Sequence, residues 1–248
     1  MTTFPSIPHL ASIVSKPSPG CYDDPDFCAL EKRAEAIAFF SYAQHVRGSM
    51  NDSPKLVEHV IVTLRAMLNT SQLRANCVRA TMLLCKTLER FGVWCCMVHG
   101  SVLIYLQGEL THTLHALDAP KFRGAFCGHV WLTCPPFDVV DLTVMHQHQA
   151  SDAQAHVESC MPEIVLGRGL PAFTPTRDEL TGDSLQPSIF WREVARIVPP
   201  CSFRERDLEV RYVPQRPMIP ADTLEELAAA FGLDGVEVCR TIERRMPC

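Results

Sequence analysis

The feature that most constrains the fold is a long apolar segment that opens on a cysteine and ends before a glycine. Residues 77–91 place apolar side chains at helical spacing, and Gly92 supplies a C-terminal stop. A helix this apolar must bury most of its surface. We therefore expect a central buried helix with Cys77 in its first turn and Asn76 as its N-cap.

The neighbouring segments follow either the helical or the strand period. Strand-like segments joined by short connections are typical of an antiparallel sheet. The chain is therefore expected to adopt an α+β fold, in which the central helix packs on an antiparallel β-sheet beside an N-terminal helical lobe. The expected helices are 27–46, 54–68, 77–91, 188–198, 223–231 and 236–245, and the expected strands are 93–98, 101–107, 127–133, 137–144 and 208–213.

Local composition divides the chain into three parts. Residues 1–26 hold five prolines and predict an extended N-terminal arm. Residues 27–185 contain the central helix and the expected hairpin of strands, and should form the core. Residues 186–248 are expected to form a C-terminal accessory region, because three prolines between positions 214 and 220 indicate a linker before the closing helical hairpin.

The overall composition is that of a globular chain and argues against several classes of partner. The 248 residues are 47% hydrophobic and carry a formal net charge of −5, with no run of Lys or Arg, so we expect no nucleic-acid partner. No apolar run approaches ~18 residues and the N-terminus lacks the pattern of a signal peptide, so we expect no membrane partner and a cytoplasmic location. The 12 cysteines are then expected to be mostly reduced thiols. No cofactor is expected.

Cys77 is the strongest candidate for a catalytic side chain. A thiolate is a far better nucleophile than a thiol, and the positive end of a helix dipole stabilises its negative charge. The free N–H groups of the same turn can also bind the oxyanion that forms when a carbonyl is attacked. Gln72 and Asn76 are candidates for an additional side-chain donor to that oxyanion. The alternative is that Cys77 is one inert core thiol among 12.

His129 and Asp141 lie in the two strands of the expected hairpin. If residues 134–136 form a three-residue loop, His129 and Asp141 face each other on one side of the hairpin, with Cβ atoms roughly 4.5–5.5 Å apart. A carboxylate in that position can accept a hydrogen bond from one ring nitrogen and leave the other nitrogen for Cys77. A two-residue loop would break this pairing.

These segments resemble a known family. The chain from Cys77 to Gly100 resembles the transglutaminase-like core, in which a nucleophile helix ends in a Gly-Ile/Val step and a strand then leads to a glycine. His129-Val130-Trp131 is similar to the His-x-Trp strand of that family, and Val140-Asp141-Leu142-Thr143 to its Val-Asp-Pro-Thr strand. The resemblance covers about residues 74–145. The sequence departs from the family pattern at Leu142, where proline is usual, and at Ala75, where glycine is usual.

The resemblance implies a papain-like, transglutaminase-like fold and an acyl-transfer chemistry. Cys77 would be the nucleophile, His129 the base, and Asp141 the acid that orients the base. The reaction would be transfer or hydrolysis at an amide or peptide carbonyl, as in a transamidase, deamidase or cysteine protease. The substrate would be a peptide, a protein or a small amide or thioester. Candidates for the wall of the substrate cleft are Trp131, His112 and His115.

Two other functions remain open. Arylamine N-acetyltransferases and related amide synthases share the Cys-His-Asp order, and residues 74–77 loosely resemble their Arg-Gly-Gly-x-Cys entry. Such an enzyme would take its acyl group from a thioester donor. The other possibility is a non-catalytic binding module on the same fold, in which the three residues have no chemical role.

Weaker patterns point to metal or redox chemistry. His146 and His148, with His112, His115 or Cys160, are suitable ligand types, but their spacing matches no standard zinc motif. The adjacent cysteines at 95 and 96 offer a minor redox alternative. The last two expected helices could be taken for a helix-turn-helix DNA-binding motif. The first of them is acidic, however, which opposes binding to DNA.

Overall fold

A computed structural model describes residues 54–73, 76–93, 95–114, 128–146, 162–176, 179, 195, 198–218, 220 and 222–246. All of them belong to one compact unit, Met50–Cys248. The expected arm 1–26, the expected helix 27–46 and nearly all of the expected helix 188–198 lie outside the described residues.

The central helix and its predecessor confirm two predictions. Helix α3 spans Pro54–Met67 and buries one apolar stripe, and the short helix α4 spans Thr70–Leu73. Helix α5 spans Cys77–Arg90, with Gly92 just beyond its end at a φ of 71°. Such a positive φ favours glycine and lets the chain leave the helix sharply.

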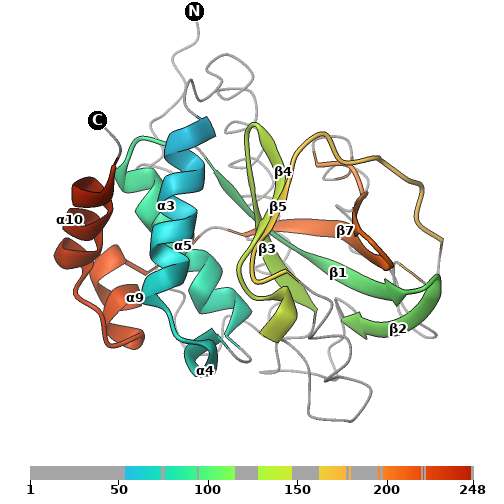
Figure 1. Cartoon of the computed structure of the whole chain (residues 1–248), viewed down its shortest axis with the longest axis horizontal. Coiled ribbons are helices and arrows are strands. Elements are labelled where there is room, and N and C mark those ends of the chain that lie inside the picture. The colour runs from blue at the N-terminus through green and yellow to red at the C-terminus, as the bar shows by residue number, and fades with distance from the viewer. Residues whose placement is uncertain are drawn as a thin grey trace, which may run out of the picture. The chain divides into compact units, whose positions relative to one another are not determined.

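Two further helices close the chain as expected. Helix α9 (Leu224–Ala230) begins at a capping box in which the side chains of Thr223 and Glu226 bond each other's backbone N–H groups. Helix α10 (Gly235–Arg245) is capped by Asp234, whose side chain accepts from the amide of Glu237. Helix α9 packs on α5, and α10 packs on α9 and α3. The four longer helices gather on one side of the sheet (Figure 1). Of the helices that the structure describes, none combines the length and apolar character of a membrane-crossing segment.

The sheet is antiparallel throughout its pairings, which confirms the expected α+β class. Its order is β5-β4-β3-β1-β7-β6, and β2 pairs with the C-terminal half of β1. The strands are β1 (Cys96–Leu106), β2 (Glu109–Leu114), β3 (His129–Cys134), β4 (Phe137–Asp141), β5 (Val165–Gly167), β6 (Cys201–Glu205) and β7 (Leu208–Met218). A one-turn 3-10 helix, η3 (Val144–His146), follows β4.

The strands differ from the predicted ones in several places, and neither β5 nor β6 was expected. Strand β1 continues through His99 and Gly100, where two separate strands were expected, and it takes up the irregularity as a register shift against β7. Part of the connection after β1 forms strand β2, because a turn at Gln107 and Gly108 folds the chain back onto β1. Both residues have positive φ, which a tight hairpin requires.

The C-terminal region is part of the core, which differs from the accessory region expected for residues 186–248. Strand β7 pairs with β1 along almost its whole length, and β6 pairs with β7. Pro214, expected in a linker, lies in β7 opposite Gly100. A proline has no N–H to donate and is tolerated in a sheet at a bulge, and the register shift lies directly beside it.

Alternation of side chains gives the sheet two buried faces. One face, which includes Val130 and Leu132, joins the apolar core formed with α5. The other face carries His129, Trp131 and Tyr212, whose side chains have no exposed surface. The sheet is therefore buried on both sides where the candidate site lies.

Gly100 permits the close packing of this second face. A Cβ atom on Gly100 would lie 2.2 Å from the carbonyl oxygen of Val213 and 2.5 Å from Cη2 of Trp131. No side chain fits there without moving the backbone of β7. The indole of Trp131 thus occupies space that only a glycine leaves open.

We expect Gly100→Ala to lower the free energy of unfolding by about 2–3 kcal/mol, because the added methyl overpacks a rigid backbone contact. Gly235→Ala is the matched control, since its nearest neighbour would be 3.3 Å away, and it should change stability by less than about 1 kcal/mol. Urea unfolding of both variants tests this. Equal midpoints would contradict the role assigned to Gly100.

Candidate active site

His129 and Asp141 form a buried hydrogen-bonded pair. His129 opens β3 and Asp141 ends β4, and Nε2 of the imidazole lies 2.6 Å from Oδ2 of the carboxylate. Neither side chain has exposed surface. The expected contact between these residues is confirmed. Its short length is typical of a charge-assisted hydrogen bond.

The hairpin reaches this contact by a different register from the expected one. Only Pro135 and Pro136 connect the strands, because Cys134 already pairs with Phe137, so the expectation of a three-residue loop is wrong. A regular two-residue hairpin would turn Asp141 to the face opposite His129. Instead the register shifts between Leu132 and Cys134, so that Leu132 pairs with Val140.

The register shift returns Asp141 to the face of the hairpin that carries His129. One extra residue on β4 shifts the alternation of side chains by one position, as a β-bulge does. Continued along the strand, the register places Asp141 opposite Trp131 and diagonal to His129. Diagonal neighbours are within reach of long side chains. The pairing was thus expected correctly, although the loop length behind it was not.

Five hydrogen bonds hold the carboxylate of Asp141. Oδ2 accepts from Nε2 of His129 and, at 3.2 Å, from the hydroxyl of Tyr212. Oδ1 accepts from the amide of Thr143 at 2.8 Å, from the hydroxyl of Thr143 at 3.2 Å and from the amide of Val144 at 3.0 Å. Burial alone would raise the pKa of Asp141, but the charge and hydrogen bond of His129, followed by the other donors, hold it below its ordinary value.

His129 is cationic at neutral pH in this environment. Burial alone would lower the pKa of its imidazole, but the Asp141 carboxylate and, to a smaller extent, Cys77 raise it to about 10. Nε2 is used by Asp141. Within the described part of the chain, the other ring nitrogen, Nδ1, is buried and has no hydrogen-bond partner.

Cys77 lies beside the imidazole of His129. It is the first residue of α5 and is 4% exposed. Its sulfur is close enough for a negative charge on it to raise the pKa of His129. The structure therefore brings together the three residues that the sequence singled out.

A hydrogen bond between α5 and β3 helps to place the thiol. The hydroxyl of Thr81 donates to the carbonyl of Val130 at 3.1 Å, and both residues are buried. Thr81 lies one helical turn after Cys77, and Val130 lies one residue after His129. The bond thus fixes the start of the helix against the start of the strand. Nothing in the sequence pattern indicated this role for Thr81.

The two side chains expected to bind an oxyanion are engaged elsewhere. Asn76 occupies the N-cap position but makes no capping bond, and its Nδ2 donates to the carbonyl of Gln72 at 2.8 Å. Nε2 of Gln72 donates to the carbonyl of Phe231 at 2.6 Å, and its Oε1 accepts from the amide of Asn69 at 3.0 Å. Both amides thus hold α4 in place, and their role at an oxyanion stays a prediction.

The expected cleft residues lie in different places. Trp131 is buried on the His129 face, with ring centroids 6.4 Å from His129 and 5.1 Å from Tyr212, so it supports the pair from within the fold. His112 pairs with Ile104 in the β1–β2 ladder, four residues along β1 from the partner of His129, or about 13 Å at ~3.3 Å per residue. His115 lies outside the described residues.

The remaining motifs gain no support as a metal or redox site. Among the described residues, no three His, Cys, Asp or Glu side chains gather in an arrangement that could hold a metal ion. His148 and Cys160 lie outside those residues. Sγ of Cys95 lies 3.6 Å from Sγ of Cys85 inside the core, and the hydrogen bond to Cys85, then burial, raises the pKa of Cys95 far above its ordinary value. A thiol held protonated in this way is a poor nucleophile.

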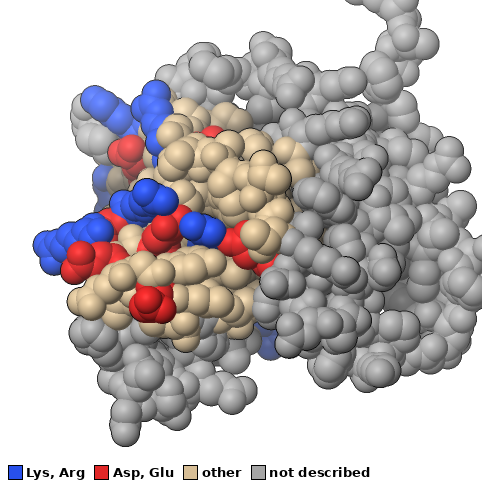
Figure 2. All heavy atoms as spheres, turned by 90° about the vertical axis from the view of Figure 1, so that its right-hand side faces the viewer, with Lys and Arg blue, Asp and Glu red and all other residues tan. Residues whose placement is uncertain are grey.

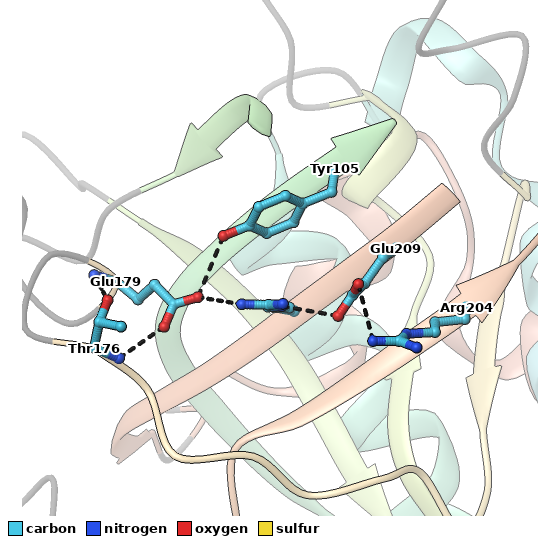
Figure 3. Close-up of polar contacts among 6 residues, drawn as sticks. Tyr105, Thr176, Glu179, Arg204 and Glu209 are labelled. Atoms are coloured by element: carbon cyan, nitrogen blue, oxygen red, sulfur yellow. Dashed lines mark hydrogen bonds and ion pairs between the residues drawn. The ribbon is translucent and has the colours of Figure 1, made fainter. Parts of the chain in front are cut away.

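A second polar cluster lies on the opposite face of β7 from Tyr212. Arg211 donates to Oε1 of Glu179 at 2.6 Å and to Oε1 of Glu209 at 2.8 Å, and it stacks on the ring of Tyr105. The hydroxyl of Tyr105 also donates to Glu179, at 3.3 Å (Figure 3). We call these four residues, Tyr105, Glu179, Arg211 and Glu209, the Glu179 clamp. Each charged side chain of the Glu179 clamp is in an ion pair, and these contacts hold Glu179 against the sheet.

The surface shown in Figure 2 fits this pairing of charges. Basic and acidic side chains are interspersed over its described part. This view therefore gives no support for an extended surface of one charge.

Compared with protein-family models, curated proteins and solved structures, the chain matches none of them.

The protonation of His129 predicts how stability depends on pH. A pKa of about 10 in the folded chain, against an ordinary 6.5, means that the pair stabilises the fold fully below about pH 6.5 and loses this effect as the pH rises towards 10. The loss of unfolding free energy in His129→Gln should therefore be larger at pH 6 than at pH 9.5.

Urea unfolding of wild type and variant at both pH values measures this difference. Thr87→Val is the control, because the buried hydroxyl of Thr87 donates to the carbonyl of Leu83 at 2.8 Å and carries no charge at either pH. Its effect on stability should not show the same decline. A His129→Gln effect that is equal at pH 6 and pH 9.5 would contradict an imidazolium at this site.

Proposed function

We propose that the protein is a thiol-dependent acyltransferase or hydrolase that acts at an amide or peptide carbonyl, with a papain-like, transglutaminase-like core. Cys77 is the nucleophile and His129 transfers protons. Asp141 orients the imidazole and favours its protonated form. One observation carries the proposal. A buried imidazolium–carboxylate pair leaves a single ring nitrogen unbound, and a cysteine at a helix N-terminus interacts with the same imidazole.

The arrangement supports a two-step reaction. The Cys77 thiolate, paired with the imidazolium, attacks the carbonyl carbon and forms a tetrahedral oxyanion. Nδ1 of His129 gives its proton to the leaving amine as the C–N bond breaks, which leaves a thioester on Cys77. Water or an acceptor amine then attacks the thioester and gives a proton to Nδ1, and the acid or amide product departs as the thiolate is restored.

The first turn of α5 supplies donors for the oxyanion in this proposal. Asn76 does not cap the helix with its side chain, so that side chain does not compete for the N–H groups of the turn. Backbone N–H groups at a helix N-terminus stabilise negative charge where it develops. They do so without help from the amide of Gln72, which bonds Phe231.

A second candidate function is the non-catalytic binding module. The observation that favours it is burial, since Cys77 is 4% exposed and His129 is fully buried. A substrate reaches the sulfur of Cys77 only if neighbouring atoms move. The acetyltransferase alternative places its thioester donor at the same cysteine and shares this requirement.

The pH dependence of Cys77 alkylation distinguishes these functions. An ordinary thiol, with a reference pKa of about 8.5, loses about tenfold in alkylation rate for each pH unit below that value. Paired with an imidazolium, Cys77 should lose less than about threefold between pH 8 and pH 6. Iodoacetamide labelling followed by peptide mass spectrometry measures the rate. The slope is informative because restricted access lowers the rate equally at every pH.

Two comparisons make this test specific. Cys239, which is 9% exposed, should follow the ordinary slope in the same digests. His129→Gln should give Cys77 the ordinary slope as well. If wild-type Cys77 and Cys239 have equal slopes, the proposed chemistry is wrong and the binding module is the better description.

An activated ester tests the acyl-enzyme directly. Incubation with p-nitrophenyl acetate should release p-nitrophenolate in a burst and add an acetyl group to the Cys77 peptide. Both signals should fall at least about 100-fold in His129→Gln, since proton transfer typically contributes 10²–10⁴-fold. An added amine that converts the product from acetate to an amide would identify a transferase. Acetylation spread evenly over the cysteines would contradict the proposal.

A further inference from the structure

Tyr212 and Asp141 meet across the concave side of a curled sheet. Asp141 ends β4 and Tyr212 lies in β7, with β3 and β1 between these strands. Three strand spacings of ~4.8 Å separate such strands by about 14 Å in a flat sheet, and side chains stand roughly perpendicular to it. The hydroxyl of Tyr212 nevertheless lies 3.2 Å from Oδ2 of Asp141. The hydrogen bond therefore depends on the curl of the sheet.

The packing beneath this bond keeps Tyr212 in place. Its ring meets that of Trp131 edge to face, with centroids 5.1 Å apart. Trp131 in turn lies over Gly100, where a Cβ atom would come within 2.5 Å of Cη2. All three residues lie on the face of the sheet that carries His129. The phenol is thus held in a fixed orientation before it bonds the carboxylate.

The two carboxylate oxygens of Asp141 are held in different ways. Oδ1 bonds only the next residues of the chain, Thr143 and Val144. Oδ2 bonds two side chains from other strands, Nε2 of His129 and the hydroxyl of Tyr212. Among the described residues, no hydrogen bond besides that from Tyr212 holds Oδ2 when His129 moves.

We propose that Tyr212 is the positioning residue of the candidate site, and that its hydroxyl keeps Oδ2 of Asp141 directed at Nε2 of His129. Its part in a reaction rests on the proposed function, whereas its hold on the His129–Asp141 pair does not. Burial, and then the charge of Asp141, keep the pKa of Tyr212 far above its ordinary value, so the phenol retains its proton and remains a donor.

Among the described residues, two cysteines also act on this pair or on Tyr212. Cys77 faces His129 from α5, and Cys201 of β6 acts on Tyr212. Burial, and then the charge of Asp138, raise the pKa of Cys201 to about 12, so its thiol stays neutral near pH 7. We therefore expect protonation of Asp141 to set the pH below which the site loses its reactivity.

Tyr212→Phe and Tyr105→Phe form a matched pair of variants. Each removes one hydroxyl that donates to a carboxylate, on opposite faces of the same sheet: Tyr212 to Asp141 and Tyr105 to Glu179. Each keeps the ring and its packing. A general loss of stability affects both variants, whereas a loss of positioning affects only the first.

The first readout is the proton on Nε2 of His129. Its low-field NMR signal, assigned by its absence in His129→Gln, should move upfield or broaden in Tyr212→Phe and remain unchanged in Tyr105→Phe. The second readout is iodoacetamide alkylation of Cys77. The pH at which its rate falls to half on the acid side should rise by about one unit in Tyr212→Phe, a tenfold loss at fixed pH, because a carboxylate with one donor fewer is protonated more easily.

The two readouts separate the two proposals. A changed Nε2 signal in Tyr212→Phe alone supports positioning by Tyr212, even if wild-type Cys77 reacts like an ordinary thiol, which would sink the proposed function only. An unchanged signal in folded Tyr212→Phe, or the same change in Tyr105→Phe, overturns the role of Tyr212. If Tyr212→Phe does not fold, 3-fluorotyrosine incorporated into Tyr105→Phe provides a stronger donor at position 212, and an Nε2 signal unaffected by it also overturns the proposal.

Discussion

The structure depends above all on the hydrogen bonds that hold the buried carboxylate of Asp141. Asp141 is 1% exposed, and an unpaired charge at such a depth would cost several kcal/mol. Its five hydrogen bonds come from the chain just after β4, from β3 and from β7. These donors meet only if the hairpin has its irregular register and the sheet curls. The arrangement of β3, β4 and β7 is thus linked to the negative charge of Asp141.

Helix α5 joins this polar site to the apolar core. Its buried side chains pack with the face of the sheet that carries Val130 and Leu132, while its first residue, Cys77, lies near the imidazole of His129. The bond from Thr81 to the carbonyl of Val130 connects the two regions. A change in the packing of α5 is therefore expected to move the thiol relative to the imidazole, which would link core stability to reactivity.

Local patterns predicted the helices well because a helix is stabilised by contacts between residues three and four positions apart. Helices α3, α5, α9 and α10 agree with their expected spans to within one residue at every end. The strands were harder. Prolines obscured the C-terminal part of β7, and no strand was expected where β2 forms. The His129–Asp141 contact was expected from a loop length that was wrong, and a register shift restored it.

The sequence by itself determined the residue types of the site, the thiol at a helix start, and the hairpin that carries His129 and Asp141. Only the tertiary structure decided that Tyr212, 71 residues from Asp141, holds the carboxylate, and that Gln72 bonds Phe231 across 159 residues. Such bonds depend on strand order and sheet curl. Because these arise from the packing of the whole core, no local periodicity encodes them.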